Sequence, residues 1–68
     1  MNEEIFNMSL RKFLKKVGVG SQNEIEKAVA QALADNAITG NEALQATMTL
    51  EVAGIKLNVK FDGTIALE

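Results

Sequence analysis

The residues of this sequence that could do chemistry are few, and they favour binding over catalysis. The chain contains no His and no Cys, which removes the usual general base, thiol nucleophiles and the common zinc ligands. Ser9 and Ser21 therefore have no imidazole to activate them, and no pair of carboxylates shares a pattern typical of acid–base catalysis. We predict that the protein is not an enzyme and that it holds no metal ion and no cofactor.

The most unusual cluster is one apolar side chain among four cations. On a 3.6-residue wheel drawn over residues 3–17, the cations share one side of the helix and a methionine projects among them. A flexible methionine can act as an apolar anchor while cations select an acidic protein partner. A solvated helix face would explain the same charges without any partner. The candidate binding residues are Met8, Arg11, Lys12, Lys15 and Lys16.

The helix expected to carry this cluster begins near Glu3 and ends at about Val17. Its core-facing side is an apolar stripe at helical spacing. Gly18 follows the last residue of this stripe, where a left-handed conformation costs glycine almost nothing. The apolar stripe consists of Phe6, Leu10, Phe13, Leu14 and Val17.

A second helix is predicted from about Gln22 to Asn36. Ser21 and Glu24 have the spacing of a capping box, in which each side chain pairs with the other residue's backbone N–H. Asn36 suits the left-handed position that follows a helix. The apolar stripe of this second helix consists of Ile25, Val29, Ala32 and Leu33, widened by Ala28.

From residue 47 onward the apolar period changes from 3.6 to 2, which is typical of strands with one apolar face. A two-residue loop at Ala53-Gly54 would pair Val52 with Ile55. A three-residue loop at Phe61-Asp62-Gly63 would then lead into a third strand over residues 64–67. The apolar positions of the first two strands are Met48, Leu50, Val52, Ile55, Leu57, Val59 and Phe61.

These elements predict an α+β fold. Two N-terminal helices would pack on one face of a three-stranded antiparallel meander, in the order α-α-β-β-β and in two layers. The 68 residues are enough for a single domain, 1–68, and no apolar run is long enough for a bilayer. Glu3 and Glu4 stand where a signal peptide would carry positive charge. We therefore expect a cytoplasmic protein without a membrane partner.

The favoured function is a small non-catalytic interaction module that uses the basic face of the first helix. Nucleic-acid binding by a helix-turn-helix with a wing is one alternative. The second helix would then enter the major groove, although its exposed side is net negative and is repelled by phosphate. A structural homodimer formed through the open edges of the sheet is the other alternative.

The opening residues MNEEIFNMSLRKFLKKVGVGSQNEIE, together with the later Thr-Met-Thr-Leu-Glu-Val, resemble a family of short bacterial proteins of unknown function. The resemblance is most specific over residues 1–26. It implies a small cytosolic bacterial domain and no particular activity, ligand or catalytic residue.

Overall fold

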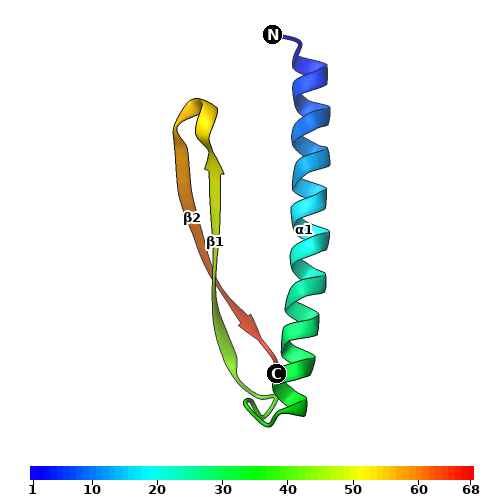
Figure 1. The fold of residues 1–68 in the computed structure, drawn as a ribbon, viewed down its shortest axis with the longest axis vertical. Helices are drawn as coiled ribbons and strands as arrows, with labels where there is room; N and C mark the ends of the chain where they lie inside the picture. The colour runs from blue at the N-terminus through cyan, green and yellow to red at the C-terminus, as the bar shows by residue number, and fades with distance from the viewer. The chain divides into compact units, whose positions relative to one another are not determined.

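The computed structural model describes all 68 residues and consists of one long helix followed by one β-hairpin (Figure 1). Helix α1 spans Glu3–Ala34, strand β1 spans Ala43–Val52, the 3₁₀ turn η1 spans Ala53–Ile55, and strand β2 spans Leu57–Ala66. The sheet has two antiparallel strands. The prediction of two helices and a three-stranded meander is therefore wrong, and the order is α-β-β.

The chain divides into two compact units, Met1–Asp35 and Asn36–Glu68. The first unit contains α1, and the second contains the loop that follows it and the hairpin. Each unit is described by itself below.

Helix α1 begins where the sequence indicates, at Glu3, because Asn2 caps it. The Asn2 backbone is extended, and its side-chain oxygen accepts a hydrogen bond of 3.1 Å from the backbone N–H of Ile5. Glu3 and Glu4 occupy the first turn, where the partial positive charge of the helix end favours carboxylates. Local chemistry is therefore sufficient to place this end of the helix.

The helix end predicted at Val17 and the separate second helix are wrong, because α1 runs through this segment without interruption. Val17, Ser21 and Ile25 follow one another at four-residue intervals, so the apolar stripe keeps its helical phase. Ser21 is half-buried on that stripe and caps nothing. Gly18 and Gly20 together lower the stability of the helix by about 2 kcal/mol relative to two alanines. A break in the helix would lower its stability more, because as many as four N–H and four C=O groups would lose their helical hydrogen-bond partners.

The other end of α1 agrees with the prediction made for Asn36. The helix ends at Ala34, and the N–H of Asp35 donates to the Gln31 carbonyl at 2.9 Å. Asn36 then takes a left-handed conformation with φ of 59°. The Gln31 amide also donates to both carboxylate oxygens of Asp35 at 3.0 Å, which fixes the last turn further.

The hairpin forms, but its predicted register is wrong by two residues. Val52 pairs with Leu57 instead of Ile55, and the loop comprises the four residues between them. The N–H of Lys56 donates to the Ala53 carbonyl at 3.1 Å, and Lys56 is left-handed with φ of 55°. A two-residue loop would require an alanine in a conformation that favours Asn, Asp or Gly. Ile55, predicted on the apolar face, lies instead in η1 and is exposed. Because side chains alternate with period 2, a shift of two residues leaves the side chains within the strands on their predicted faces.

The predicted second turn at Phe61-Asp62-Gly63 and the third strand are also wrong. Strand β2 continues through both Asp62 and Gly63, which pair with Thr47 and Ala46. The Thr47 hydroxyl donates to Asp62 Oδ1 at 2.9 Å, so the aspartate acts across the strands and not in a turn. Gly63 occupies an apolar-face position and keeps the following residues in phase with Phe61. The alternation thus extends through a dipeptide that usually marks a turn.

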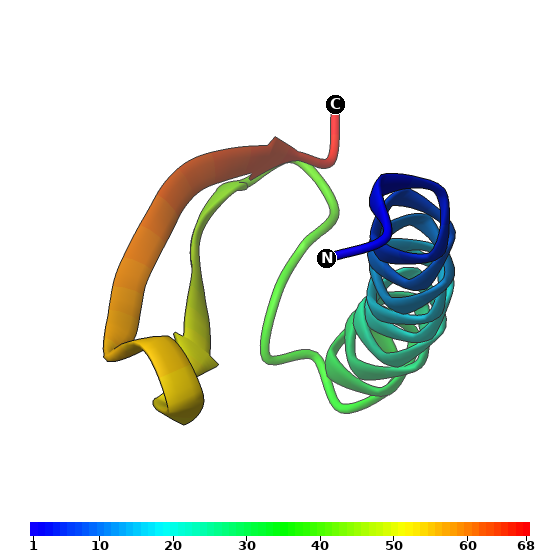
Figure 2. The ribbon, with the colours of Figure 1, turned by 90° about the horizontal axis from the view of Figure 1, so that it is seen from above.

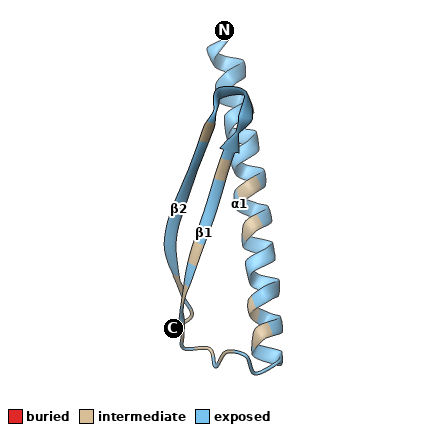
Figure 3. Cartoon of the chain, turned by 60° about the vertical axis from the view of Figure 1, so that its left-hand side comes forward, coloured by how far each residue is buried: buried red, intermediate tan, exposed pale blue.

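The two strands, which curve along their length in Figure 2, present one wholly apolar face and one largely polar face. No residue of the chain is buried (Figure 3), and the half-buried strand residues all lie on the apolar face. A two-stranded hairpin is marginally stable in water unless its apolar face is covered. The apolar face consists of Leu44, Ala46, Met48, Leu50, Val52, Leu57, Val59, Phe61, Gly63 and Ile65.

Candidate interaction face of the helix

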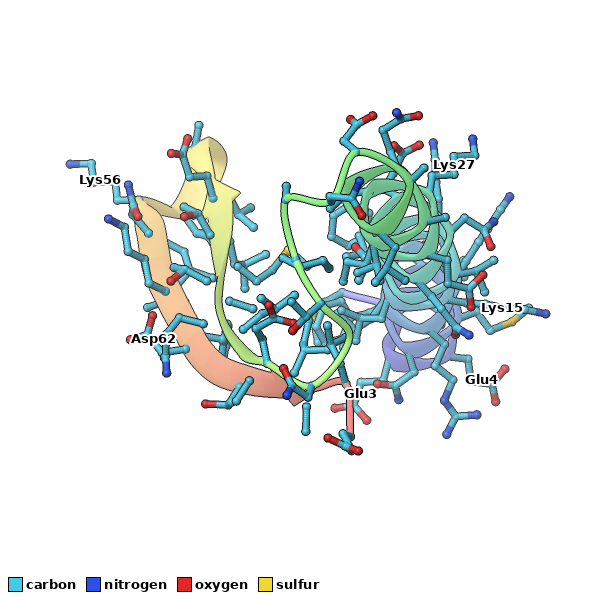
Figure 4. The ribbon with its side chains drawn as sticks, turned by 90° about the horizontal axis from the view of Figure 1, so that it is seen from below. Glu3, Glu4, Lys15, Lys27, Lys56 and Asp62 are labelled. Atoms are coloured by element: carbon cyan, nitrogen blue, oxygen red, sulfur yellow. The ribbon has the colours of Figure 1, made fainter.

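The five residues predicted to bind a partner lie on one continuous helix, all of them exposed. Arg11 and Lys12 are three and four residues beyond Met8, which makes them its neighbours on the helix surface. Lys15 and Lys16 stand in the same relation to Lys12. Helical spacing therefore brings the five side chains together, and Lys15 extends away from the helix in Figure 4.

The continuity of α1 adds Val19 to this face. Val19 lies between the predicted helix end at Val17 and the predicted second start at Gln22, but in α1 it follows Lys15 by four residues and Lys16 by three. Its side chain is 53% exposed, compared with 72% for Met8. Val19 could have been assigned to this face from the sequence, because it lies eleven residues, or about three helical turns, after Met8. We define the basic face as Met8, Arg11, Lys12, Lys15, Lys16 and Val19.

The basic face lies on the side of α1 opposite the apolar stripe. Whatever covers the stripe therefore leaves Met8 and Val19 in water. None of the side-chain hydrogen bonds of the chain uses any of the four cations. Their donors are available to a partner, and no bond within the chain has to be broken first.

Charge changes sign along α1. Residues 11–16 carry four positive charges, whereas the following turns contain Glu24 and Glu26 with Lys27 as the only cation. The Gln22 amide donates to Glu26 Oε1 at 3.0 Å on this second half. The positive potential is therefore confined to the first half of the helix, and an acidic ligand would be attracted there.

The titratable group with a perturbed pKa, Glu42, lies in the loop before β1. Its carboxylate accepts hydrogen bonds from the backbone N–H of Thr39 at 2.8 Å and of Gly40 at 2.9 Å. These bonds, that from Thr39 foremost, lower the pKa of Glu42. The bonds hold the loop against the start of the strand and give this carboxylate a structural role.

No group of three or more His, Cys, Asp or Glu side chains could hold a metal ion. No helix is both long enough and apolar enough to cross a membrane. Glu42 and the basic face belong to different units of the chain.

The fold and the exposed faces define the class as a small α-β-β protein with amphipathic elements. Comparison with family models gives the particular assignment: the chain belongs to a family of unknown function (DUF6494), whose model matches residues 1–68. This match confirms the resemblance seen in the opening residues. No curated protein and no solved structure matches the chain.

Proposed function

We propose that this protein is a small non-catalytic protein-interaction module whose basic face on α1 binds an acidic partner. The observation that carries the proposal is the exposure of two apolar side chains, Met8 and Val19, among four cations on the side of the helix that the stripe does not use. Apolar anchors surrounded by charge are typical of partner-selective contact surfaces.

The chemistry of the face favours a protein partner over nucleic acid. A helix that reads DNA needs positive charge along the length that enters the groove, and the second half of α1 carries Glu24 and Glu26. Single-stranded nucleic acid requires aromatic stacking platforms, and the basic face contains none. An acidic protein surface with an apolar pocket would complement both the four cations and the apolar side chain of Met8.

The proposal is tested by affinity capture from an extract of the source cells with the full chain as bait. The variant Arg11→Glu/Lys15→Glu should lose the captured protein, since it reverses two charges beside Met8. The matched control is Lys56→Glu/Lys60→Glu, which makes the same change of charge on the hairpin and should retain the partner. Raising the salt concentration should weaken the wild-type complex.

Two results would contradict the proposal. Capture of the same protein by both variants would show that the basic face is a solvated helix surface. Capture of nucleic acid that depends on Arg11 and Lys15 would replace the protein partner with the nucleic-acid alternative.

A further inference from the structure

The outer edge of strand β2 has no strand beside it. The sheet consists of β1 and β2 alone, so each strand has one paired edge and one open edge. None of the backbone hydrogen bonds made outside the helices and strands ends on a residue of β2. An open edge presents a row of N–H and C=O groups that can pair with another strand. A two-stranded sheet also gains stability when further strands extend it.

One backbone hydrogen bond shows which residues of β2 turn their backbone groups to this open edge. The N–H of Leu67 donates to the Glu42 carbonyl at 3.0 Å. These two residues continue the register of the pair Ala43 and Ala66, so they stand opposite each other. Since bonded and non-bonded pairs alternate along an antiparallel ladder, the odd-numbered residues of β2 bond to β1. The residues whose N–H and C=O groups face the open edge are Asn58, Lys60, Asp62, Thr64 and Ala66.

The charged side chains of β2 select one register for a second copy of the same strand. Lys60 and Asp62 are the only charged residues of β2, and the backbone groups of both face the open edge. Outward-facing residues must stand opposite outward-facing residues, so the possible antiparallel registers differ by shifts of two residues. A two-fold axis at Phe61 places Lys60 of each copy opposite Asp62 of the other, which gives two ion pairs.

The neighbouring registers are unfavourable for the same reason. An axis at Lys60 would place the two lysines opposite each other, and an axis at Asp62 would do the same to the two aspartates. Like charges directly opposite one another destabilise a sheet. Registers further away leave both side chains without a charged partner within β2. Only the axis at Phe61 therefore satisfies the backbone and the charges together.

The apolar side chains fit the same register. It pairs residues 57–65 of the two copies and keeps one apolar face continuous across four strands. Phe61 is the most exposed large apolar side chain of the strands, at 61%, and it meets its own copy at the axis, where two aromatic rings attract each other. Gly63 stands opposite Val59 of the other copy. An added Cβ at Gly63 meets nothing within 4 Å, so the glycine leaves room beside the rings.

The charged groups are free to make these ion pairs. The Thr47 hydroxyl donates to Asp62 Oδ1 at 2.9 Å, which holds the carboxylate on the polar face and leaves Oδ2 without a partner. The Lys60 ammonium takes part in none of the side-chain hydrogen bonds of the chain. A second copy therefore gains both ion pairs without breaking a bond within either chain.

The outer edge of β1 is a poorer partner. Its only charged residue is Glu51, so pairing β1 with its own copy produces no ion pair. Pairing β1 of one copy with β2 of another can bring Glu51 opposite Lys60, but each contact then contains one ion pair. Such a contact is heterologous and leaves an open edge at each end, so it would build long assemblies. The β2 edge gives two ion pairs and a closed contact.

We propose that two copies of this chain pair antiparallel along the outer edges of their β2 strands, about a two-fold axis at Phe61, and form one four-stranded sheet. The contact is isologous, since each strand presents the same edge to the other. It uses residues of the hairpin only, whereas the proposed binding of an acidic partner uses the basic face of α1. Either proposal can therefore fail without the other.

Charge reversal in the full chain tests the register, with native mass spectrometry as the measurement. Asp62→Lys and Lys60→Asp should each give the mass of one chain, because each variant places like charges opposite one another at both positions. An equimolar mixture of the two variants should give a dimer with one chain of each, since opposite charges then meet again. The matched control is Glu51→Lys, which changes a charge on β1 and should keep the dimer of the wild type.

Disulfide cross-linking is a second measurement that leaves the charges unchanged, and the chain contains no native cysteine. Phe61→Cys should form a covalent dimer with itself on mild oxidation, because residue 61 stands opposite its own copy within the Cα distance that a disulfide spans. Val59→Cys is the control and should not cross-link, since the two copies of residue 59 are about 13 Å apart along the strands.

Several results would overturn the proposal. A wild-type chain that is monomeric at every concentration would do so, as would a dimer of either charge-reversal variant alone or the absence of a dimer in their mixture. Assemblies larger than two chains, or loss of the dimer in Glu51→Lys, would indicate pairing between β1 and β2 of different copies. Cross-linking of Val59→Cys in place of Phe61→Cys would exclude the axis at Phe61.

Discussion

The helix and the hairpin are both amphipathic, but only the helix has a direction built into its apolar side. On α1 the stripe carries two phenylalanines in its first half and only aliphatic residues and alanines in its second, and the charge changes from positive to negative over the same turns. On the hairpin, apolar residues of similar size occupy both ends of the face, Leu44 with Ile65 and Val52 with Leu57. The difference teaches that the two halves of α1 present different chemistry to a partner, whereas the two ends of the hairpin present the same apolar chemistry.

The largest effect is expected from Gly18→Ala combined with Gly20→Ala. Each glycine lies inside α1, and an added Cβ meets nothing within 4 Å at either position. Replacing both should raise the free energy of unfolding by about 2 kcal/mol, because alanine loses less backbone entropy in a helix. Circular dichroism during denaturation by urea measures the change.

Gly40→Ala is the matched control for those substitutions. Gly40 has φ of 102°, a conformation that strains alanine, so the same chemical change should destabilise the loop by roughly 1 kcal/mol. If the double substitution at Gly18 and Gly20 also lowered the stability, a broken helix with a left-handed glycine would replace the continuous α1.

The next largest effect is expected from a substitution in the hairpin that tests whether Gly63 lies within a strand. In β2 it pairs with Ala46, and an added Cβ meets nothing within 4 Å. Gly63→Val should therefore stabilise the protein by up to about 1 kcal/mol, since a β-branched residue suits a strand better than glycine. A higher melting temperature is the expected result. A lower one would support a turn at this dipeptide, where valine could not take a left-handed conformation.

The smallest effect is a dependence on pH carried by Glu42. Because its pKa is lowered below the ordinary 4.5 in the folded chain, the ionised carboxylate contributes stability above the unfolded value. That stability is lost as the pH falls through the folded value. The Glu42→Gln variant should therefore have a lower melting temperature than the wild type at neutral pH, and this difference should become smaller below pH 4.5. A difference in melting temperature that does not change with pH would show that the charge of Glu42 does not stabilise the fold.

The sequence predicted the elements whose signals are local and consistent. The helix start near Glu3, the left-handed Asn36 and the apolar alternation of the strands are all confirmed. It also predicted the positions of Met8 and the four cations along one helix, although their binding role stays a prediction. Each of these features depends on side-chain spacing or on one residue's backbone preference.

The errors at the helix break and at the third strand share one physical cause. Gly18 and the Ser21 capping pattern, like the Asp62-Gly63 dipeptide, are turn signals of a few residues inside a longer periodic segment. In both units the period continued through them, because a whole stripe or face gains more from staying in phase than one local turn can supply. The register error has a different cause. Alternation cannot distinguish two registers of the hairpin that differ by two residues, since such a shift leaves both faces of the strands unchanged.

The most direct measurement is affinity capture from an extract of the source cells with the wild-type chain and with the Arg11→Glu/Lys15→Glu variant as baits. The account predicts a protein that only the wild-type chain retains. Retention of the same protein by both baits would contradict the account, because the basic face would then be a solvated helix surface.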